Sequence, residues 1–188
     1  DKDHQEIDEL LSLFGTFKKN SRKFITNQSH PLTAPLSSQW ANDFATDTSR
    51  DAGYTASDFK QEGMEISFKV NNHPFSLHLP GKHNMENAIA ATAVAHQLGV
   101  DLATCAAALK NYEGIYRRHQ VLGQKQGVWL IDDYAHNPVK CAAAIAACQP
   151  IAPKVIAWFQ PHGYKPTKFL RADFVKELAA VLRPADEI

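Results

Sequence analysis

The hydrophobic and polar residues in the first part of the chain follow two different periodicities. Apolar residues recur at helical spacing over residues 5–19, and the Ala-rich stretch 84–98 predicts a second helix that stops at Gly99. Apolar and polar residues alternate over residues 64–70 and 75–79, with a polar turn between them, which predicts a β-hairpin. The first part of the chain is therefore expected to combine helices with a small sheet.

In the second part of the chain, short apolar runs alternate with helical stretches. Strands are expected at residues 121–122, 128–131 and 154–159, and helices at 138–148 and 169–182. Strands that alternate with helices are typical of a parallel sheet with right-handed crossovers, so we predict an α/β fold. Elsewhere the pattern predicts a short strand, a loop region with little regular structure and a helix, at residues 23–26, 27–53 and 102–110.

Composition and charge exclude several classes of protein. The chain has 188 residues, and its 20 basic side chains balance 20 acidic ones, so it builds no field for nucleic acid or an anionic membrane. No apolar stretch is long enough to span a bilayer, and we expect no signal peptide. The three cysteines lack metal-binding spacing, and Cys141 and Cys148 share one predicted helix face. We interpret these two as core or interface thiols of a cytoplasmic protein; the sequence gives no oligomeric state.

One loop, residues 132–138, concentrates reactive side chains between a strand and a helix. Its sequence is Asp-Asp-Tyr-Ala-His-Asn-Pro, and it follows the apolar run 128–131. Asn137 is expected to cap the following helix, with Pro138 in its first turn. Ligands of α/β proteins bind at the carboxyl ends of strands, beside helix N-termini. The loop is therefore either a ligand site or an ordinary connection with a capping Asn.

Two further clusters carry groups that suit a nucleotide. Asn84 and Asn87 are three residues apart, so they share one face of a first helical turn. A side-chain amide offers both a donor and an acceptor, which suits the edge of adenine, although Asn near a helix start is also a common cap. Arg117 and Arg118 follow Gly114 in a stretch that could clamp phosphate. Paired arginines are also common on solvated surfaces.

The three clusters fall in one order along the chain: HNxxN, then GxxRR, then DDYAH. With the opening Asp3-His4 and the later segment 159–162 (FQPH), they resemble the Mur ligase family over nearly the whole chain. These enzymes use ATP to build the peptide stem of bacterial peptidoglycan. The FQPH segment is most similar to the branch that adds L-alanine to UDP-N-acetylmuramate, and the murein peptide ligase branch of cell-wall recycling is also similar.

The resemblance implies a domain plan. Residues 1–116 would be the C-terminal part of a central ATP-binding domain, and residues 117–188 the N-terminal part of a Rossmann-like domain with a parallel sheet, joined by a hinge near 113–119. The GTxGKT-type phosphate loop and the UDP-binding domain of the family have no counterpart here. We therefore expect a piece of a longer enzyme that does not hydrolyse ATP by itself. A nucleotide-binding module without catalysis is the alternative.

The resemblance also implies roles for individual residues in binding ATP and Mg²⁺. Asn84 and Asn87 match the adenine-binding pair, with His83 beside them. His4 matches the metal-binding His of the family's DH motif, or is a surface His. Magnesium takes few ligands from protein and prefers oxygen, so a histidine ligand is uncommon on general grounds.

The later clusters would act on the phosphates and the reacting groups. Arg118 matches the Arg that reaches the ATP phosphates, with Arg117 in support, because a guanidinium holds phosphate oxygens bidentately. Asp133 matches the Asp that holds the nucleotide from the C-terminal domain, and Asp132 ends the strand. His136 lies where the family places a polar residue near the acyl-phosphate oxygens. It would orient the amine, stabilise developing charge or act as a base.

The FQPH segment departs from the family at two positions. The L-alanine-adding branch reads FQPHRYxRT, and here Gly163 and Pro166 replace its two arginines. Lys165, Lys168 or Arg171 would have to supply the positive charge. His162 and Tyr164 are expected substrate contacts, although a structural role for Tyr164 is equally open. The expected partners are a UDP-muramyl acceptor and an amino acid or peptide, and the departure leaves open which amino acid or peptide is added.

Overall fold

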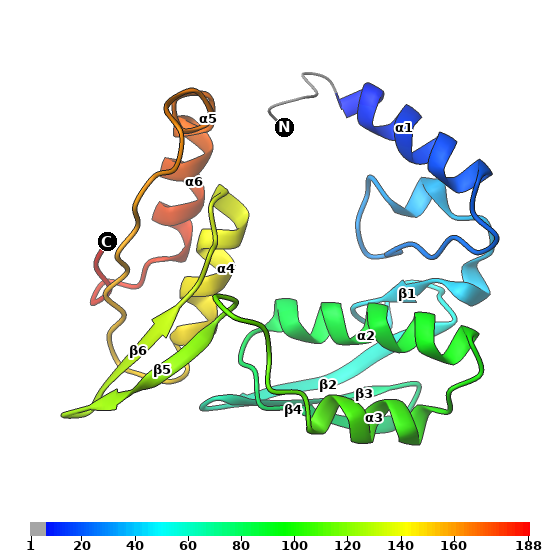
Figure 1. Ribbon diagram of the computed structural model, residues 1–188, viewed down its shortest axis with the longest axis horizontal. Helices are drawn as coiled ribbons and strands as arrows, with labels where there is room; N and C mark the ends of the chain where they lie inside the picture. The colour runs from blue at the N-terminus through cyan, green and yellow to red at the C-terminus, as the bar shows by residue number, and fades with distance from the viewer. Residues whose placement is uncertain (1–6) are drawn as a thin grey trace. The chain divides into compact units, whose positions relative to one another are not determined.

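The computed structural model describes residues 7–188, and these form two compact units (Figure 1). The first unit comprises the described residues up to Lys60 together with two later segments, and the second comprises two short segments and the C-terminal part of the chain. The later segments of the first unit are 67–76 and 85–110, and the second unit consists of 61–66, 77–84 and 111–188. The predicted division of the chain at residue 116 stays a prediction.

A four-stranded sheet of order β1-β2-β3-β4 dominates the first part of the chain. Its strands are β1 (Phe44–Ala45), β2 (Tyr54–Glu62), β3 (Glu65–Val70) and β4 (His73–Leu77), and β1 pairs with β2 in parallel. Strand β3 alternates strictly between buried and exposed residues, which is the pattern of a strand with one face in the core. Asn71 and Asn72, both with positive φ, form the turn between β3 and β4.

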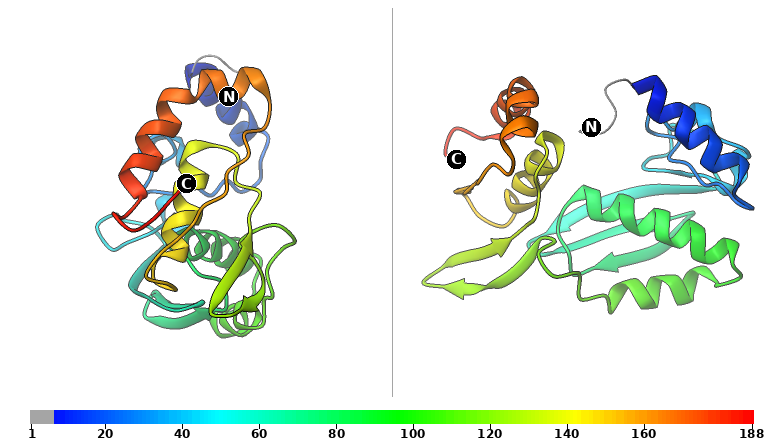
Figure 2. Two further views of the ribbon diagram at one scale, coloured as in Figure 1. Left: turned by 90° about the vertical axis from the view of Figure 1, so that its left-hand side faces the viewer. Right: turned by 45° about the horizontal axis from the view of Figure 1, so that its top comes forward.

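Helices accompany this sheet. They are α1 (Ile7–Lys19), α2 (Lys82–Gln97) and α3 (Leu102–Lys110), and two 3₁₀ turns, η1 (Ala34–Leu36) and η2 (Trp40–Asn42), precede β1. Helix α2 buries one stripe of residues at spacings of three and four, as expected for a helix packed on one side. Figure 2 shows α2 and α3 running beside the strands. The buried stripe consists of Met85, Ala88, Ile89, Thr92 and Ala93.

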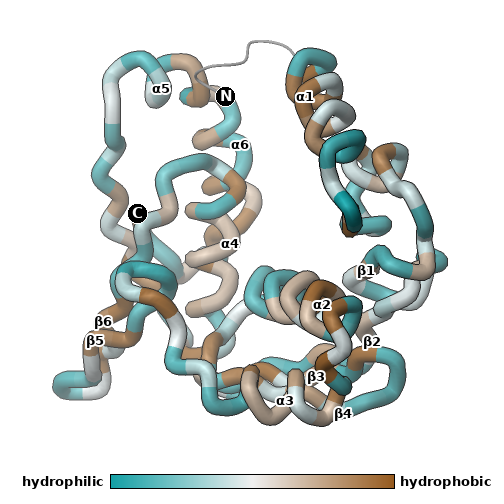
Figure 3. Tube along the Cα trace, turned by 45° about the vertical axis from the view of Figure 1, so that its right-hand side comes forward, coloured by the Kyte–Doolittle hydropathy of each residue, from teal (hydrophilic) through white to brown (hydrophobic). Residues whose placement is uncertain are grey.

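The C-terminal part of the second unit contains a β-ribbon and three helices. Strands β5 (Gln120–Lys125) and β6 (Val128–Asp132) pair antiparallel, and α4 (Pro138–Cys148) packs against α6 (Arg171–Val181). The short helix α5 (Tyr164–Phe169) precedes α6. Many hydrophobic residues of β5 and β6 are exposed, and Figure 3 colours the positions of hydrophobic residues along these strands brown.

A network around Asp186 closes the C-terminal end of the second unit. Its carboxylate accepts hydrogen bonds from Val155 N at 2.8 Å, from Gln149 Nε2 at 3.0 Å and from the Arg183 guanidinium at 2.9 and 3.0 Å. Arg183 also donates to the carbonyl oxygen of Gln149 at 3.0 Å. These bonds, the Arg183 side chain foremost, hold the pKa of Asp186 well below its usual range. The network ties the end of the chain to the segment after α4.

The structure confirms the α/β class and most of the predicted helices. Helices at 102–110 and 138–148 and the hairpin of β3 and β4 match the predictions, and the predicted helix at 84–98 corresponds to α2. Among the described residues, no helix is long and apolar enough to cross a membrane. All three cysteines are free, and Cys141 is buried as predicted, while Cys148 is half-buried.

Several local predictions are wrong. Residues 23–26 form no strand, and residues 154–159 contain only an isolated bridge at Ile156. The predicted helix 169–182 starts earlier and is broken at Leu170. Strands β5 and β6 pair antiparallel, a pairing for which no prediction was made from the sequence. The two-residue turn Gln126-Gly127, with φ of 52° and 81°, explains it. Such a turn joins antiparallel neighbours, whereas parallel strands need a crossover of a dozen or more residues.

Candidate functional site

The β5–β6 ribbon brings two of the sequence clusters together. Gln120 at the start of β5 pairs with Asp132 at the end of β6, so the residues before β5 and after β6 leave the ribbon at the same end. The backbone N–H of Tyr134 donates to the carbonyl oxygen of Arg117 at 2.9 Å. The register of a two-stranded ribbon thus places the arginine loop (residues 114–119) beside the acidic loop (residues 132–138).

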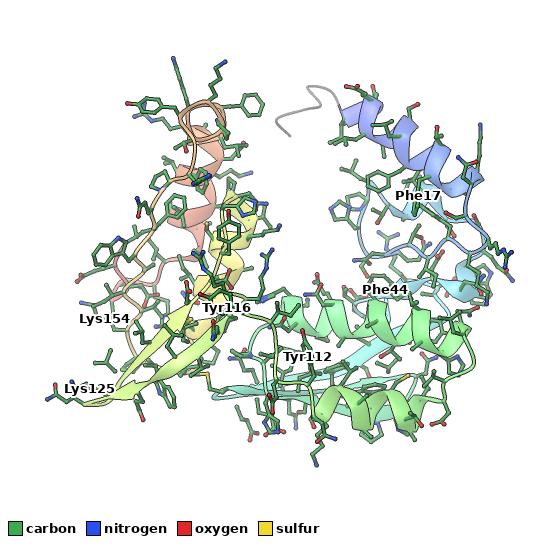
Figure 4. The ribbon with its side chains drawn as sticks, in the orientation of Figure 1. Phe17, Phe44, Tyr112, Tyr116, Lys125 and Lys154 are labelled. Carbon is green, nitrogen blue, oxygen red and sulfur yellow. The ribbon has the colours of Figure 1, made fainter. Side chains whose placement is uncertain are left out.

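Cationic side chains of the arginine loop gather on Tyr134. The guanidinium carbon of Arg117 lies 5.0 Å from the centre of the Tyr134 ring, and that of Arg118 lies 6.0 Å from it. Nε of Arg117 also forms an ion pair with Oδ2 of Asp132 at 3.3 Å. Both arginines remain exposed, as does Tyr116, which marks the loop in Figure 4. Two positive charges held on an aromatic face are suited to bind an anion.

Asp133 is the better buried of the two carboxylates in the acidic loop. Its side chain is 20% exposed, and its Oδ2 accepts a hydrogen bond from the backbone N–H of His119 at 2.9 Å. The His119 side chain is 2% exposed. Burial lowers the pKa of His119, the charge of Asp133 opposes this shift, and His83 adds to it. One carboxylate oxygen of Asp133 is therefore fixed by the protein itself.

His136 and Asn137 lie where the acidic loop turns into α4. Nδ1 of His136 lies 2.9 Å from the carbonyl oxygen of Tyr134, so Nδ1–H donates and Nε2 of a neutral ring is left as an acceptor. The side-chain oxygen of Asn137 accepts from Lys140 N at 2.9 Å, which confirms the predicted N-cap with Pro138 in the first turn. The cap fixes the residue that directly follows His136.

The start of α2 lies in the same unit as these loops. Asn84 donates through Nδ2 to the carbonyl oxygen of Pro80 at 2.8 Å, which leaves one amide hydrogen and Oδ1 for another partner. The ring of His83 lies 6.2 Å from that of His119. One helical turn beyond Asn84, Asn87 is exposed on α2 and belongs to the first unit.

Gln61 holds the loop before α2 against the end of α4 within the second unit. Its Oε1 accepts from Gly81 N at 3.0 Å, and its Nε2 donates to the carbonyl oxygen of Ala147 at 2.9 Å. Gln61 also donates to Gly63 O at 3.0 Å. One amide side chain thereby joins three segments that are distant in sequence.

The structure brings some of the predicted site residues together. Arg117, Arg118, Asp133 and His136 surround Tyr134, and His83 reaches His119 beside them. His162 and Tyr164 are exposed, Tyr164 by 96%, at the start of α5. His4 lies outside the described residues.

Sequence reasoning missed three residues that organise the site. The sequence assigns Tyr134 no role of its own, and the structure places its ring under both guanidinium groups. His119 belonged to the arginine cluster without a role, and Gln61 lies in a stretch for which no element was predicted. Only His119 could have been noticed from the sequence, because a titratable ring directly after two arginines is an unusual combination.

The described residues do not provide a metal centre. Among residues 7–188, no group of three or more His, Cys, Asp or Glu side chains could hold a metal ion.

Comparisons with known proteins match both parts of the chain to one family. Residues 4–95 match the model of the Mur ligase middle domain, and residues 117–188 match that of the Mur ligase glutamate ligase domain. UDP-N-acetylmuramate–L-alanine ligase of Caldicellulosiruptor bescii is 33% identical over 198 residues, which span 95% of this chain and 42% of that relative. The Acidithiobacillus ferrooxidans relative of the same name is 42% identical over 109 residues, 57% of this chain and 24% of its own length.

A solved structure shows the same fold. The crystal structure of the UDP-N-acetylmuramate–alanine ligase of Thermotoga maritima superposes with a TM-score of 0.71 at 26% identity, over 93% of this chain and 39% of that protein. The chain thus spans less than half the length of the relatives that it matches. The order of the clusters, both domain models and the shared fold lead to one conclusion: this chain belongs to the Mur ligase family.

Proposed function

We propose that the full-length protein is an ATP-dependent ligase of peptidoglycan synthesis that joins an amino acid to the carboxylate of UDP-N-acetylmuramic acid. The observation that carries this proposal is the contact between the arginine loop and the acidic loop. It gathers Arg117, Arg118, Asp133 and His136 in one place. The relatives are named UDP-N-acetylmuramate–L-alanine ligases. We therefore propose L-alanine as the amino acid that is added.

The described side chains fit a nucleotide. The exposed guanidinium groups on Tyr134 are suited to phosphate oxygens, and Asp133 keeps one carboxylate oxygen beyond the one that His119 fixes. Asn84 and Asn87 would hold the adenine ring with their amides, and His83 would line the same helix start. ATP supplies the phosphoryl group that activates the substrate carboxylate as an acyl phosphate.

His136 is proposed to act on the second half of the reaction. Its Nδ1–H is held by the Tyr134 carbonyl oxygen, so Nε2 is the atom that can accept a proton or orient the incoming amine. Arg118 would stabilise the negative charge that develops on the phosphoryl oxygens as the amine attacks. Both side chains are exposed, so substrates can reach them.

Magnesium is part of the proposal only for the full-length protein. Among residues 7–188 no group of three or more ligand side chains could hold the ion, and His4 is the candidate ligand that the family resemblance gives within this chain. The reaction and its nucleotide substrates place the full-length enzyme in the cytoplasm in this proposal.

A second candidate is the ligation of a peptide, as in murein peptide ligases. The observation in its favour is the pair Gly163 and Pro166, which stand where the L-alanine-adding branch has arginines. Lys165 and Lys168 lie in α5 and Arg171 starts α6; these cations would have to replace the lost charge, with His162 and Tyr164 as further substrate contacts. A changed set of cations implies a changed anionic group on the substrate.

Substrate profiling of the full-length protein tests the proposal. Phosphate release is measured with ATP, magnesium and UDP-N-acetylmuramic acid, in the presence of single amino acids or of the cell-wall tripeptide. We expect release that depends on L-alanine. Release that depends on the tripeptide would select the second candidate, and release with none of these substrates would contradict both.

A further inference from the structure

His119 is a buried ionisable side chain at the site, and the proposed reaction gives it no role. It immediately precedes β5 and is 2% exposed, while its neighbours Arg117 and Arg118 are exposed. Its backbone has a φ of 48°, in the left-handed region that disfavours residues other than glycine. The fold thus turns this one ring inward at the point where two charged side chains turn outward.

Both ring nitrogens of His119 face ionisable groups. Nε2 lies 3.7 Å from Sγ of Cys148, the last residue of α4, and Nδ1 lies 3.8 Å from Oδ2 of Asp133. The backbone N–H of His119 already donates to the same Oδ2 at 2.9 Å. Within the described part of the chain, Nδ1 is a buried nitrogen without a hydrogen-bond partner. A movement of about 1 Å brings Nδ1 into hydrogen-bonding range of that carboxylate.

The thiol of Cys148 selects the tautomer of the ring. Burial first, and then the charge of Asp133, raise the pKa of Cys148 to about 11, so the sulfur keeps its proton at neutral pH. Burial lowers the pKa of His119, so the ring is neutral and carries one proton. When Cys148 donates to Nε2, that proton resides on Nδ1 and faces Asp133. The other tautomer would direct a lone pair at a carboxylate oxygen, which repels it.

We propose that His119 is a positioning residue for Asp133. Its backbone N–H and its Nδ1–H converge on Oδ2 and leave Oδ1 of the carboxylate for the nucleotide. Cys148 acts one step further away, because its S–H decides which ring nitrogen of His119 carries the proton. The inference rests on the proposed function in one respect, which is that Asp133 binds the nucleotide.

The test compares two amide variants of the full-length protein. Asparagine places its amide nitrogen near the position of Nδ1, and glutamine places it near that of Nε2. His119→Asn therefore keeps a donor to Asp133, and His119→Gln loses it. A hydrogen bond to a charged group corresponds to a factor of about ten or more in affinity. Calorimetry should show the Kd for ATP raised about tenfold in His119→Gln and less than about threefold in His119→Asn.

Two further readouts separate positioning from a loss of fold. The KM for the amino-acid substrate is expected to stay the same in both variants, because His119 does not face that substrate in the proposal. In NMR spectra of histidine-labelled protein, we expect the proton of His119 on Nδ1, and expect Cys148→Val to lose this preference while Cys148→Ser keeps it. If an amide variant does not fold, the Cys148 pair gives the same comparison through the Kd for ATP.

Specific results would overturn the inference. Equal Kd values for the two amide variants, both with the thermal stability of the wild type, would show that Nδ1–H does not position Asp133. A wild-type spectrum with the proton on Nε2 would exclude the proposed tautomer. A wild-type protein that binds ATP without ligase activity would contradict the proposed reaction but leave the comparison of the His119 variants valid. A wild-type protein that does not bind ATP would contradict both the proposed reaction and the positioning role of His119.

Discussion

The close approach at Gly81 gives a stability prediction that can be worked out from distances. Gly81 has a φ of +100°, and a Cβ added there would lie 2.7 Å from Cβ of Ala147 and 2.7 Å from Cε1 of His83. Its backbone N–H donates to Gln61 Oε1 at 3.0 Å, which holds the loop in place. Gly81→Ala therefore adds a methyl group where the second unit has no room for it.

The expected cost has two parts. A positive φ costs a residue with a side chain about 1–2 kcal/mol, and overpacking in a filled site costs a further ~1–3 kcal/mol. Gly81→Ala should thus destabilise the chain by about 2–5 kcal/mol. Gly63→Ala is the matched control, because Gly63 also has a positive φ, lies in the same unit, and would meet nothing within 4 Å. It should cost only the backbone part, about 1–2 kcal/mol.

Urea unfolding of the two variants, followed by circular dichroism, measures both costs. The Gly81→Ala midpoint should fall well below that of Gly63→Ala, with an unchanged slope. Full-length Gly81→Ala should also bind ATP more weakly, because Asn84 lies three residues further along the same helix start. Equal midpoints for the two alanine variants would refute the close packing of Gly81 against Ala147 and His83.

Four further predictions concern α4, the end of the chain and catalysis. Asn137→Ala should lower the free energy of unfolding by about 1 kcal/mol through loss of the N-cap, and Asn137→Asp should not; equal losses would exclude the cap. The Cys148 thiol, with its pKa raised to about 11 by burial, should react slowly with iodoacetamide at pH 8 and faster as the pH rises, and fast labelling at pH 8 in the folded chain would contradict its burial. The hydrogen bonds from Arg183 and its neighbours depress the pKa of Asp186, so their stabilisation is present above about pH 4 and is lost as the pH falls below it. A chain with Asp186→Asn should lose this part of the acid dependence of its urea midpoint, and an unchanged dependence would count against the network. The 188-residue chain should release no phosphate from ATP, and magnesium-dependent turnover by this chain would show that expectation to be wrong.

The sequence predicts those helices and strands whose formation depends on residues that are close in the sequence. Asn137 and Pro138 define the start of α4 by capping chemistry, and alternation defines β3 with its Asn71-Asn72 turn. Strand β2 was missed because its second half carries charged residues such as Asp58 and Lys60. That half is a strand because β3 pairs with it, which is information that lies outside the segment.

The candidate site was likewise predictable only where it depends on residues that are close in the sequence. The three clusters are visible in the sequence because each combines unusual residue types at short spacing. Their contacts depend on the ribbon register that pairs Gln120 with Asp132, and this register follows from the Gln126-Gly127 turn together with the irregularity between Val121 and Gly123. Side-chain partners such as Tyr134 for the arginines, or His119 for Asp133, follow only from three-dimensional packing.

A crystal structure of the full-length protein with a non-hydrolysable ATP analogue tests the central claim most directly. The account predicts adenine on the Asn84 and Asn87 amides, phosphate oxygens within hydrogen-bonding distance of Arg118, and Asp133 in contact with the same nucleotide. A nucleotide bound away from Arg118 and Asp133 would contradict it.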